Sequence, residues 1–258
     1  MRKRNTATKH PASKILDSAS FAPGTKLNTP PKKISRRDRK PQDARQVPPD
    51  PARVAEIFRR FETANPHPKG ELDYANAFTL LVAVVLSAQA TDFGVNKATP
   101  ALFAVAGSPA KMAALGEEKL QHMIKTIGLY RTKAKNVIAL SHRLIKDFGG
   151  EVPRSREALE TLPGVGRKSA NVVMNTAFGA PVIAVDTHIF RVSNRVPLAP
   201  GKTPLEVERG LEKVIPGAFK PHAHHWLILH GRYICKARRP ECERCLISDL
   251  CRWPDKRA

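Results

Sequence analysis

The chain has 258 residues, of which 41% are hydrophobic, so it can bury a sizeable core in one or two domains. Its 44 Lys and Arg residues outnumber 23 Asp and Glu residues, which gives a formal net charge of +21. This excess indicates a polyanionic partner, although charge kept only for solubility would look the same. The longest apolar run, 77–90, is shorter than the roughly 20 residues of a membrane span. All four cysteines lie in the last 24 residues, which excludes a typical disulfide-stapled secreted fold and indicates a reducing compartment.

Residues 1–50 differ in composition from the rest of the chain. They hold 7 of the 22 prolines and 13 basic against 4 acidic residues, so we expect a disordered basic leader. We favour a tail that adds sequence-independent phosphate contacts, and an organelle transit peptide is the alternative. Residues 51–258 keep an excess of 12 positive charges, so the folded part is basic by itself. We expect a cytoplasmic, nucleoid-associated protein of the bacterial type, and the leader leaves organelle targeting open.

From residue 51 onward the apolar spacing predicts helices almost everywhere, so the expected fold class is all-α. The helices are expected at 51–64, 76–90, 92–105, 117–127, 131–147, 155–162, 167–178, 187–196, 203–214 and 221–235. The one short β-branched run, 182–185, is as consistent with a buried extended connection as with a strand.

Gly164, Val165 and Gly166 lie in a tight turn, after Pro163, between two of the predicted helices. Their backbone N–H groups precede the start of the second helix, where the helix dipole favours an anion. A DNA phosphate fits such a site without any reading of bases, and a plain helical hairpin is the alternative.

Lys168 lies at the start of this second helix, next to Arg167. The helix N-terminus and Arg167 both disfavour a second positive charge, which favours a neutral, nucleophilic amine. Such an amine suits attack on a sugar carbon to form a Schiff base, whereas a lysine that contacts phosphate is the simpler alternative. After the helix, the extended residues 181–186 can return Asp186 close to Lys168. Asp186 could cap the next helix and also stabilise positive charge on a sugar.

The four cysteines follow the pattern Cys235-x6-Cys242-x2-Cys245-x5-Cys251. Four thiolates so close in sequence predict a tetrahedral sulfur site for zinc or for a four-iron cluster. Zinc sites usually have two tight Cys-x2-Cys pairs and here there is one, so the spacing favours iron and sulfur without deciding.

Lys236, Arg238 and Arg239 lie between the first two cysteines. A metal site would hold this basic loop in fixed geometry, and we expect it to contact DNA phosphates. The metal would then supply folding energy rather than chemistry.

The hairpin ending in Lys168, the Val185-Asp186-Thr187-His188 segment and the cysteine spacing together resemble the endonuclease III family. The resemblance extends over 86–92, 127–130 and 225–231, and so covers 51–258 almost without interruption. Members are bifunctional: they remove oxidised pyrimidines from DNA and cleave the abasic site by β-elimination through a lysine Schiff base.

The resemblance implies a two-domain helix-hairpin-helix glycosylase fold, with a six-helix barrel at 70–180 and a [4Fe–4S] cluster domain formed by 51–69 and 181–258. It implies Lys168 and Asp186 as catalytic residues, and Cys235, Cys242, Cys245 and Cys251 as cluster ligands. Gln89 matches the residue that fills the gap left by a flipped nucleotide, and Leu129 matches an apolar wedge. The expected partner is double-stranded DNA with oxidised pyrimidines or abasic sites, and we expect a monomer that has no membrane partner.

Two other functions share part of this pattern. The A/G-mismatch adenine glycosylases share the hairpin and the cluster but lack a lysine at the position of Lys168. A non-enzymatic, redox-sensing DNA-binding protein would have no need of the Lys168 and Asp186 pair. The enzyme of oxidised-pyrimidine repair is therefore the favoured prediction.

Overall fold

The structure is a computed structural model that describes residues 49–256, so the predicted leader lies outside the described residues except for Pro49 and Asp50. Over these residues it consists of helices and loops without a strand, which confirms the all-α prediction. The α-helices are α1 (Pro51–Ala64), α2 (Ala77–Ser87), α3 (Asp92–Val105), α4 (Pro109–Leu115), α5 (Glu117–Met123), α6 (Tyr130–Phe148), α7 (Arg156–Glu160), α8 (Arg167–Phe178), α9 (Thr187–Arg195), α10 (Pro204–Val214) and α11 (Lys220–Tyr233). The short 3-10 helices are η2 (Gly217–Phe219) and η3 (Cys242–Arg244).

The structure differs from the predicted elements mainly at two places. α4 was not predicted; it begins with Pro109, and the Ser108 side chain accepts a hydrogen bond from the Lys111 backbone N–H. α2 ends at Ser87 rather than at residue 90, since Gln89 has a φ of +55° that no helix can accommodate. Residues 182–185 form a connection, buried at 183–185, and not a strand.

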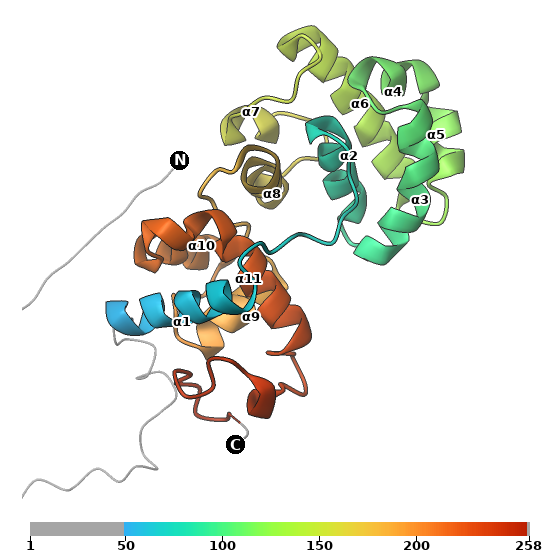
Figure 1. Cartoon of the computed structure of the whole chain (residues 1–258). Coiled ribbons are helices and arrows are strands. Elements are labelled where there is room, and N and C mark those ends of the chain that lie inside the picture. Colours follow the sequence, from blue (N-terminus) through green and yellow to red (C-terminus); the bar gives the residue numbers. More distant parts are fainter. Residues whose placement is uncertain (1–48, 257–258) are drawn as a thin grey trace, which may run out of the picture. The chain divides into compact units, whose positions relative to one another are not determined.

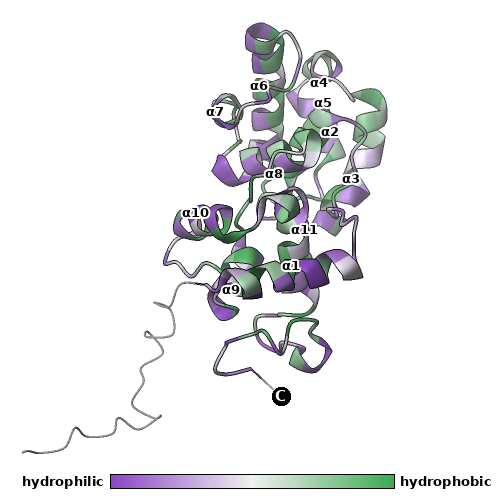
Figure 2. Cartoon of the chain, turned by 60° about the vertical axis from the view of Figure 1, so that its left-hand side comes forward, coloured by the Kyte–Doolittle hydropathy of each residue, from purple (hydrophilic) through white to green (hydrophobic). Residues whose placement is uncertain are grey.

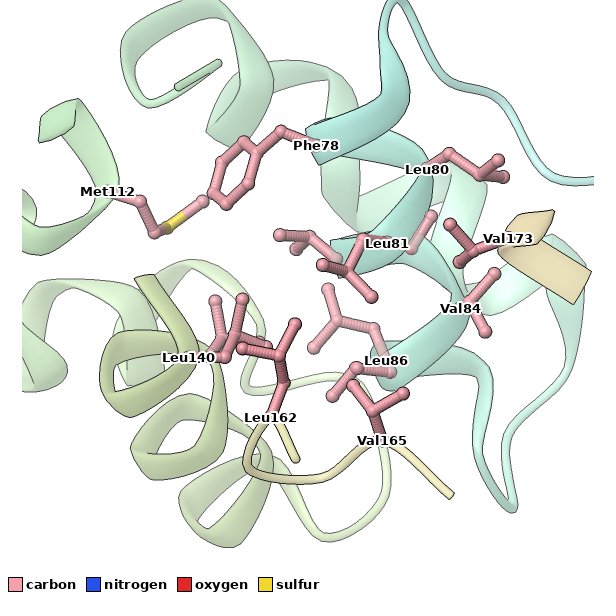
Figure 3. Packing of buried hydrophobic residues seen from close by; sticks show 14 of the residues in the cluster. Phe78, Leu80, Leu81, Val84, Leu86, Met112, Leu140, Leu162, Val165 and Val173 are labelled. Carbon is pink, nitrogen blue, oxygen red and sulfur yellow. The ribbon is translucent and has the colours of Figure 1, made fainter. Parts of the chain in front are cut away.

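A first core cluster is built from α2 to α8 (Figure 1). α2 is its most apolar element, with nine of eleven residues buried, and Asn76 and Thr79 form a capping box that starts it. Figure 3 shows Leu81 and Leu86 of α2 among Leu140, Val165 and other side chains from later helices. The start of α8 is thereby fixed against a rigid core.

A second core cluster is built from α1, α9, α10 and α11 together with the cysteine segment. Figure 2 shows hydrophilic and hydrophobic residues alternating around α1, as expected for a helix with one buried face. Phe58 of α1 lies within 6.3 Å of Trp226 of α11, measured between ring centroids. Cys235, Cys245 and Cys251 pack against this cluster, so the cysteine segment is anchored to the same helices.

The chain passes between the two clusters twice, at 65–76 and at 179–186. At the first passage, Trp226 Nε1 donates to the Asn65 carbonyl at 2.8 Å. At the second, the Asn175 side-chain amide donates to the Ala180 carbonyl at 3.0 Å, and that of Asn171 to the Ile183 carbonyl at 3.3 Å. Backbone groups of both passages thus find partners in the helices beside them. No helix among residues 49–256 is both long and apolar enough to cross a bilayer.

Arg53 of α1 is a buried polar link inside the second cluster, with 7% of its surface exposed. Its guanidinium donates to the carbonyls of Val196 at 2.9 Å, Pro197 at 2.7 Å and Leu250 at 3.1 Å. Three segments that are distant in sequence are therefore held by one side chain.

We predict that Arg53→Ala lowers the free energy of unfolding by about 3 kcal/mol, since it leaves buried carbonyls without donors. Urea unfolding followed by circular dichroism measures this change. Arg59→Ala is the matched control, because Arg59 on the same helix makes only an exposed ion pair with Glu56 and its loss should be nearly neutral. Equal effects of the two substitutions would contradict the role assigned to Arg53.

His224 of α11 is 3% exposed, and its Nδ1 has no hydrogen-bond partner within 49–256. Burial, followed by the nearby charges of His225 and Lys168, lowers the pKa of His224 to about 3. The imidazole therefore stays neutral in the folded protein at neutral and mildly acidic pH.

We predict that His224 makes the protein less stable as the pH falls. Below a pH of about 6.5 the unfolded chain binds a proton at this histidine that the folded protein does not bind until about pH 3, so stability drops by up to about 1.4 kcal/mol per pH unit. His224→Gln should give a shallower slope in urea unfolding between about pH 7 and about pH 5. Val173→Ala destabilises the core without removing an ionisable group and should keep the wild-type slope; identical slopes for wild type and His224→Gln would contradict this account.

Candidate active site and cysteine cluster

A cavity of about 180 Å³ lies where the two core clusters meet. It is lined by residues of the connection at 69–74, by one side of α2 and the turn after it, by the start of α3, and by one side each of α8 and α11. The polar residues that the cavity brings together include Glu71, Gln89, Asp92, Lys168, His224 and Arg232. A concave, mostly apolar site with a few convergent polar groups is typical of a ligand-binding site.

Lys168 is the second residue of α8, and its exposed side chain lines this cavity. The preceding Arg167 points its guanidinium to the buried Glu208, with Nη2 to Oε1 at 2.5 Å and Nε to Oε1 at 3.0 Å. The charge of Arg167 is therefore largely neutralised, and its expected repulsion of a charged Lys168 is weaker than the sequence suggested. Besides Arg167, the neighbours of the Lys168 amine are the N-terminus of α8 and the buried His224.

Asp186 is half-buried and caps α9: its Oδ1 accepts from the backbone N–H groups of His188 and Ile189, both at 2.8 Å. It does not lie among the residues lining the cavity. The segment before it runs back along α8, as the bond from Asn171 to Ile183 shows, and Asn171 is one turn beyond Lys168. Both capping bonds use Oδ1, which leaves Oδ2 without a hydrogen bond among the described residues.

The hairpin turn has the geometry that its glycines predict. Gly164 has a φ of +79°, and a Cβ there would lie 3.0 Å from the side chain of Asn136, so glycine is required for conformation and for space. Val165 is buried and anchors the turn in the first core cluster. Gly166 caps α8 without any side-chain hydrogen bond, and no acidic residue lies in the first turn. This helix start is left with backbone N–H groups suited to an anion.

Gln89 and Leu129 lie on two adjacent turns. A Cβ placed on Gly128, the residue before Leu129, would lie 4.0 Å from the Gln89 carbonyl oxygen. Both residues have left-handed backbone conformations, with φ of +55° and +60°. Leu129 is 61% exposed, although a leucine would ordinarily be expected in the core. Strained, exposed positions of this kind are frequent at functional sites.

The four cysteines line a second, smaller cavity next to the second core cluster. Burial, followed by repulsion from the three other thiols, raises the pKa of Cys245 to about 11. All four cysteines are partly buried and line this one cavity, and a cationic metal centre there would stabilise their thiolates. Arg195 Nη1 is 3.8 Å from Cys235 Sγ, and the Arg195 guanidinium lies 4.4 Å from the ring centre of Trp253.

The basic loop between the first two cysteines is held by hydrogen bonds from Arg195 to the carbonyls of Lys236 at 2.6 Å and Ala237 at 2.7 Å. The side chains of Arg238 and Arg239 are exposed. Lys236 forms an ion pair with Glu241, so its charge is less available to a phosphate than the sequence alone predicted. Sequence patterns did not reveal Arg195 or the contacts of Arg232, because their partners lie tens of residues away.

The comparisons with known proteins agree with this geometry. Residues 82–217 match the family model of the HhH-GPD superfamily base excision DNA repair protein, and 235–251 match the iron-sulfur binding domain of endonuclease III. Endonuclease III of Escherichia coli K12 is 58% identical over 205 residues, covering 80% of this chain and 97% of the relative. Endonuclease III of Treponema pallidum is 59% identical over 198 residues, covering 77% and 94%.

Solved structures show the same fold. The structure of a trapped endonuclease III–DNA covalent intermediate, an estranged-adenine complex, has a TM-score of 0.74 and 45% sequence identity, covering 79% of this chain and 96% of that one. A thermostable thymine-DNA glycosylase has a TM-score of 0.68 and 27% identity, covering 78% and 94%. This chain therefore belongs to the endonuclease III family of HhH-GPD base-excision DNA repair proteins, which act as DNA glycosylases and abasic-site lyases and carry a [4Fe–4S] cluster.

Proposed function

We propose that this enzyme removes oxidised pyrimidines from double-stranded DNA, with Lys168 as the nucleophile. The observation that carries the proposal is the position of Lys168 in the cavity, which Gln89 also lines. A cavity of about 180 Å³ offers room for a base that has left the duplex. The damaged nucleotide would be extruded into it, at a cost that is lower for poorly stacked lesions.

In the proposed reaction the Lys168 Nζ forms a bond to the deoxyribose C1′ while the bond from C1′ to the base breaks. The base leaves with the electron pair and takes up a proton, and the sugar ring opens to give a Schiff base. Loss of a C2′ proton then expels the 3′ phosphate by β-elimination. Asp186 would stabilise the positive charge on the sugar and accept the proton of the lysine amine through its Oδ2.

The surfaces around the cavity would hold the DNA. The N-terminus of α8, which follows Gly164, Val165 and Gly166 and has no side-chain capping bond, would bind a backbone phosphate. Leu129, exposed in its strained turn, would wedge beside the opposite strand, and Gln89 would enter the gap. Arg238 and Arg239 would add phosphate contacts from the cysteine segment.

Cys235, Cys242, Cys245 and Cys251 would hold the [4Fe–4S] cluster, in line with the cavity that all four line. The bound cluster would supply folding energy to the cysteine segment rather than take part in base removal. We also propose that the two core clusters correspond to a barrel domain at 70–180 and a cluster domain at 51–69 and 181–258. The relatives are named endonuclease III, which does not favour an adenine glycosylase or a non-enzymatic redox sensor.

We predict that borohydride traps a covalent adduct between the wild-type protein and a duplex containing thymine glycol, with one protein per duplex if the enzyme acts as a monomer. Lys168→Gln should abolish trapping, because no amine remains at C1′. Asp186→Asn can still cap α9 and should slow trapping by about 100-fold or more, since the carboxylate is gone.

Lys146→Gln is the control, since Lys146 is an exposed lysine on α6 and does not line the cavity; it should trap as the wild type does. A Lys168→Gln protein that still forms the adduct would refute the assignment. An adduct with abasic DNA but none with thymine glycol would refute the oxidised-pyrimidine specificity and leave the lyase.

We further propose that the basic leader binds DNA phosphates without regard to sequence. Deleting 1–48 leaves Asp50, which caps α1, and removes an excess of positive charge. Binding to undamaged duplex DNA should then weaken, and the slope of log affinity against log salt should become shallower by roughly 0.9 for each phosphate that the leader neutralises. An unchanged salt slope, measured by fluorescence anisotropy, would favour a role in targeting instead.

A further inference from the structure

Arg232, near the end of α11, is the hub of a charged network at the edge of the cavity. Its Nη1 forms an ion pair with Asp92 Oδ2 at 2.6 Å and a second ion pair with Glu71. The neighbouring Tyr233 donates its hydroxyl hydrogen to the Glu71 carboxylate. One guanidinium therefore serves two carboxylates, and all three charged side chains line the cavity that contains Lys168.

The three partners come from segments that are otherwise separate. Glu71 lies in the connection between the two core clusters, Asp92 is the first residue of α3, and Arg232 belongs to the second core cluster's α11. Asn96, one turn further along α3, holds the same connection: it donates to the Glu71 carbonyl at 2.7 Å and accepts from the Asp73 backbone N–H at 3.0 Å. The start of α3 is thus fixed to both the connection and α11.

This fixed helix start lies three residues after Gln89. The Gln89 turn is short: the Ala90 N–H donates to the Ser87 carbonyl at 3.0 Å, and Thr91 caps α3 through the Gly94 N–H at 3.1 Å. A non-glycine residue at φ +55° is strained and persists only where its surroundings hold it. The core holds the α2 side of the turn, and the ion pairs of Arg232 hold the α3 side.

Charge gives Arg232 a second effect at the same place. Asp92 and Glu71 would otherwise present two carboxylates to the phosphates of a bound duplex. Like charges brought together oppose binding, so a cation between the carboxylates favours DNA at this edge of the cavity.

We propose that Arg232 is a positioning residue that holds the Gln89 turn in the conformation that enters the gap left by an extruded nucleotide. Arg232 acts through Asp92 and the start of α3. The inference rests on the proposed function, because it takes the role of Gln89 from there.

The test uses the full-length protein with its cluster and a duplex that carries an uncleavable tetrahydrofuran abasic analogue opposite 2-aminopurine. The 2-aminopurine is the base opposite the abasic analogue, and its fluorescence reports whether its stacking changes when the gap is filled. Wild-type protein at saturation defines the full signal, and Gln89→Gly defines the signal without the inserted side chain. Arg232→Gln should give a signal close to that of Gln89→Gly, with a Kd about tenfold higher than the wild-type value.

A purely structural role is separated from positioning by three further measurements. The rate of borohydride trapping on thymine-glycol DNA at saturating Arg232→Gln should fall less than the affinity does, because Lys168 stays in place on α8. Asp92→Ala removes the link to α3 and keeps the pair between Arg232 and Glu71, so it should also remove most of the 2-aminopurine signal. This variant tests the inference if Arg232→Gln does not fold. Arg232→Lys keeps the charge but replaces the planar guanidinium, whose Nη1 meets both carboxylates, with an ammonium group on a shorter side chain, and it should recover only part of the signal.

A full 2-aminopurine signal in folded Arg232→Gln or Asp92→Ala would overturn the inference. That result together with normal trapping would leave the proposed function standing. Absence of trapping in the wild-type protein would instead count against the proposed function itself, so the two failures are distinguishable.

Discussion

The arrangement of this site depends on one constraint: a single chain forms two hydrophobic core clusters and passes between them twice. Close packing of the side chains in each cluster fixes the positions of the helices that surround it. The ends of those helices, and the turns between them, are then free to present polar groups where the clusters meet. Lys168 comes from the first cluster, and His224 and Arg232 come from the second. A site of this kind requires both cores to be intact before any chemistry is available.

Polar side chains that bond to residues distant in sequence fix the segments that the hydrophobic cores do not hold. Arg53 joins α1 to two later segments, Arg195 orders the basic loop beside Cys235, and Arg232 joins α11 to α3. Each guanidinium binds several carbonyls or carboxylates at once, which a lysine could not do with the same geometry. In the cysteine segment, where regular secondary structure is scarce, such bonds take the place of a packed helix, and the proposed bonds from the four cysteines to the cluster would add to them.

Much of this could be predicted from local sequence patterns. The helices followed from apolar spacing and the hairpin from Pro163, Gly164 and Gly166, while the cysteine pattern led to the proposed cluster ligands. The return of the chain along α8 also followed, because a helix of known rise and an extended segment of known reach limit where Asp186 can lie. Local periodicity and spacing depend only on residues close in sequence, so they can be recognised without knowledge of the three-dimensional structure.

The features that could not be predicted are those set by distant residues. Arg167 was expected to repel a charged Lys168, but Glu208, 41 residues later, neutralises it. Leu129 is apolar and would be assigned to the core by composition, but its backbone conformation places it in solvent. α4 was missed because seven residues show too little periodicity, although Pro109 after Ser108 is a recognisable helix start. The link between Glu71, Asp92 and Arg232 has no signature in the sequence at all.

The central claim is that one amine in the cavity carries the reaction, and it can be tested without any substitution. Wild-type protein is trapped with borohydride on a thymine-glycol duplex, digested with protease, and the peptide that carries the sugar remnant is sequenced by mass spectrometry. The account predicts that the modified residue is Lys168. Modification at any other lysine or at the N-terminal amine, with Lys168 unmodified, would contradict it.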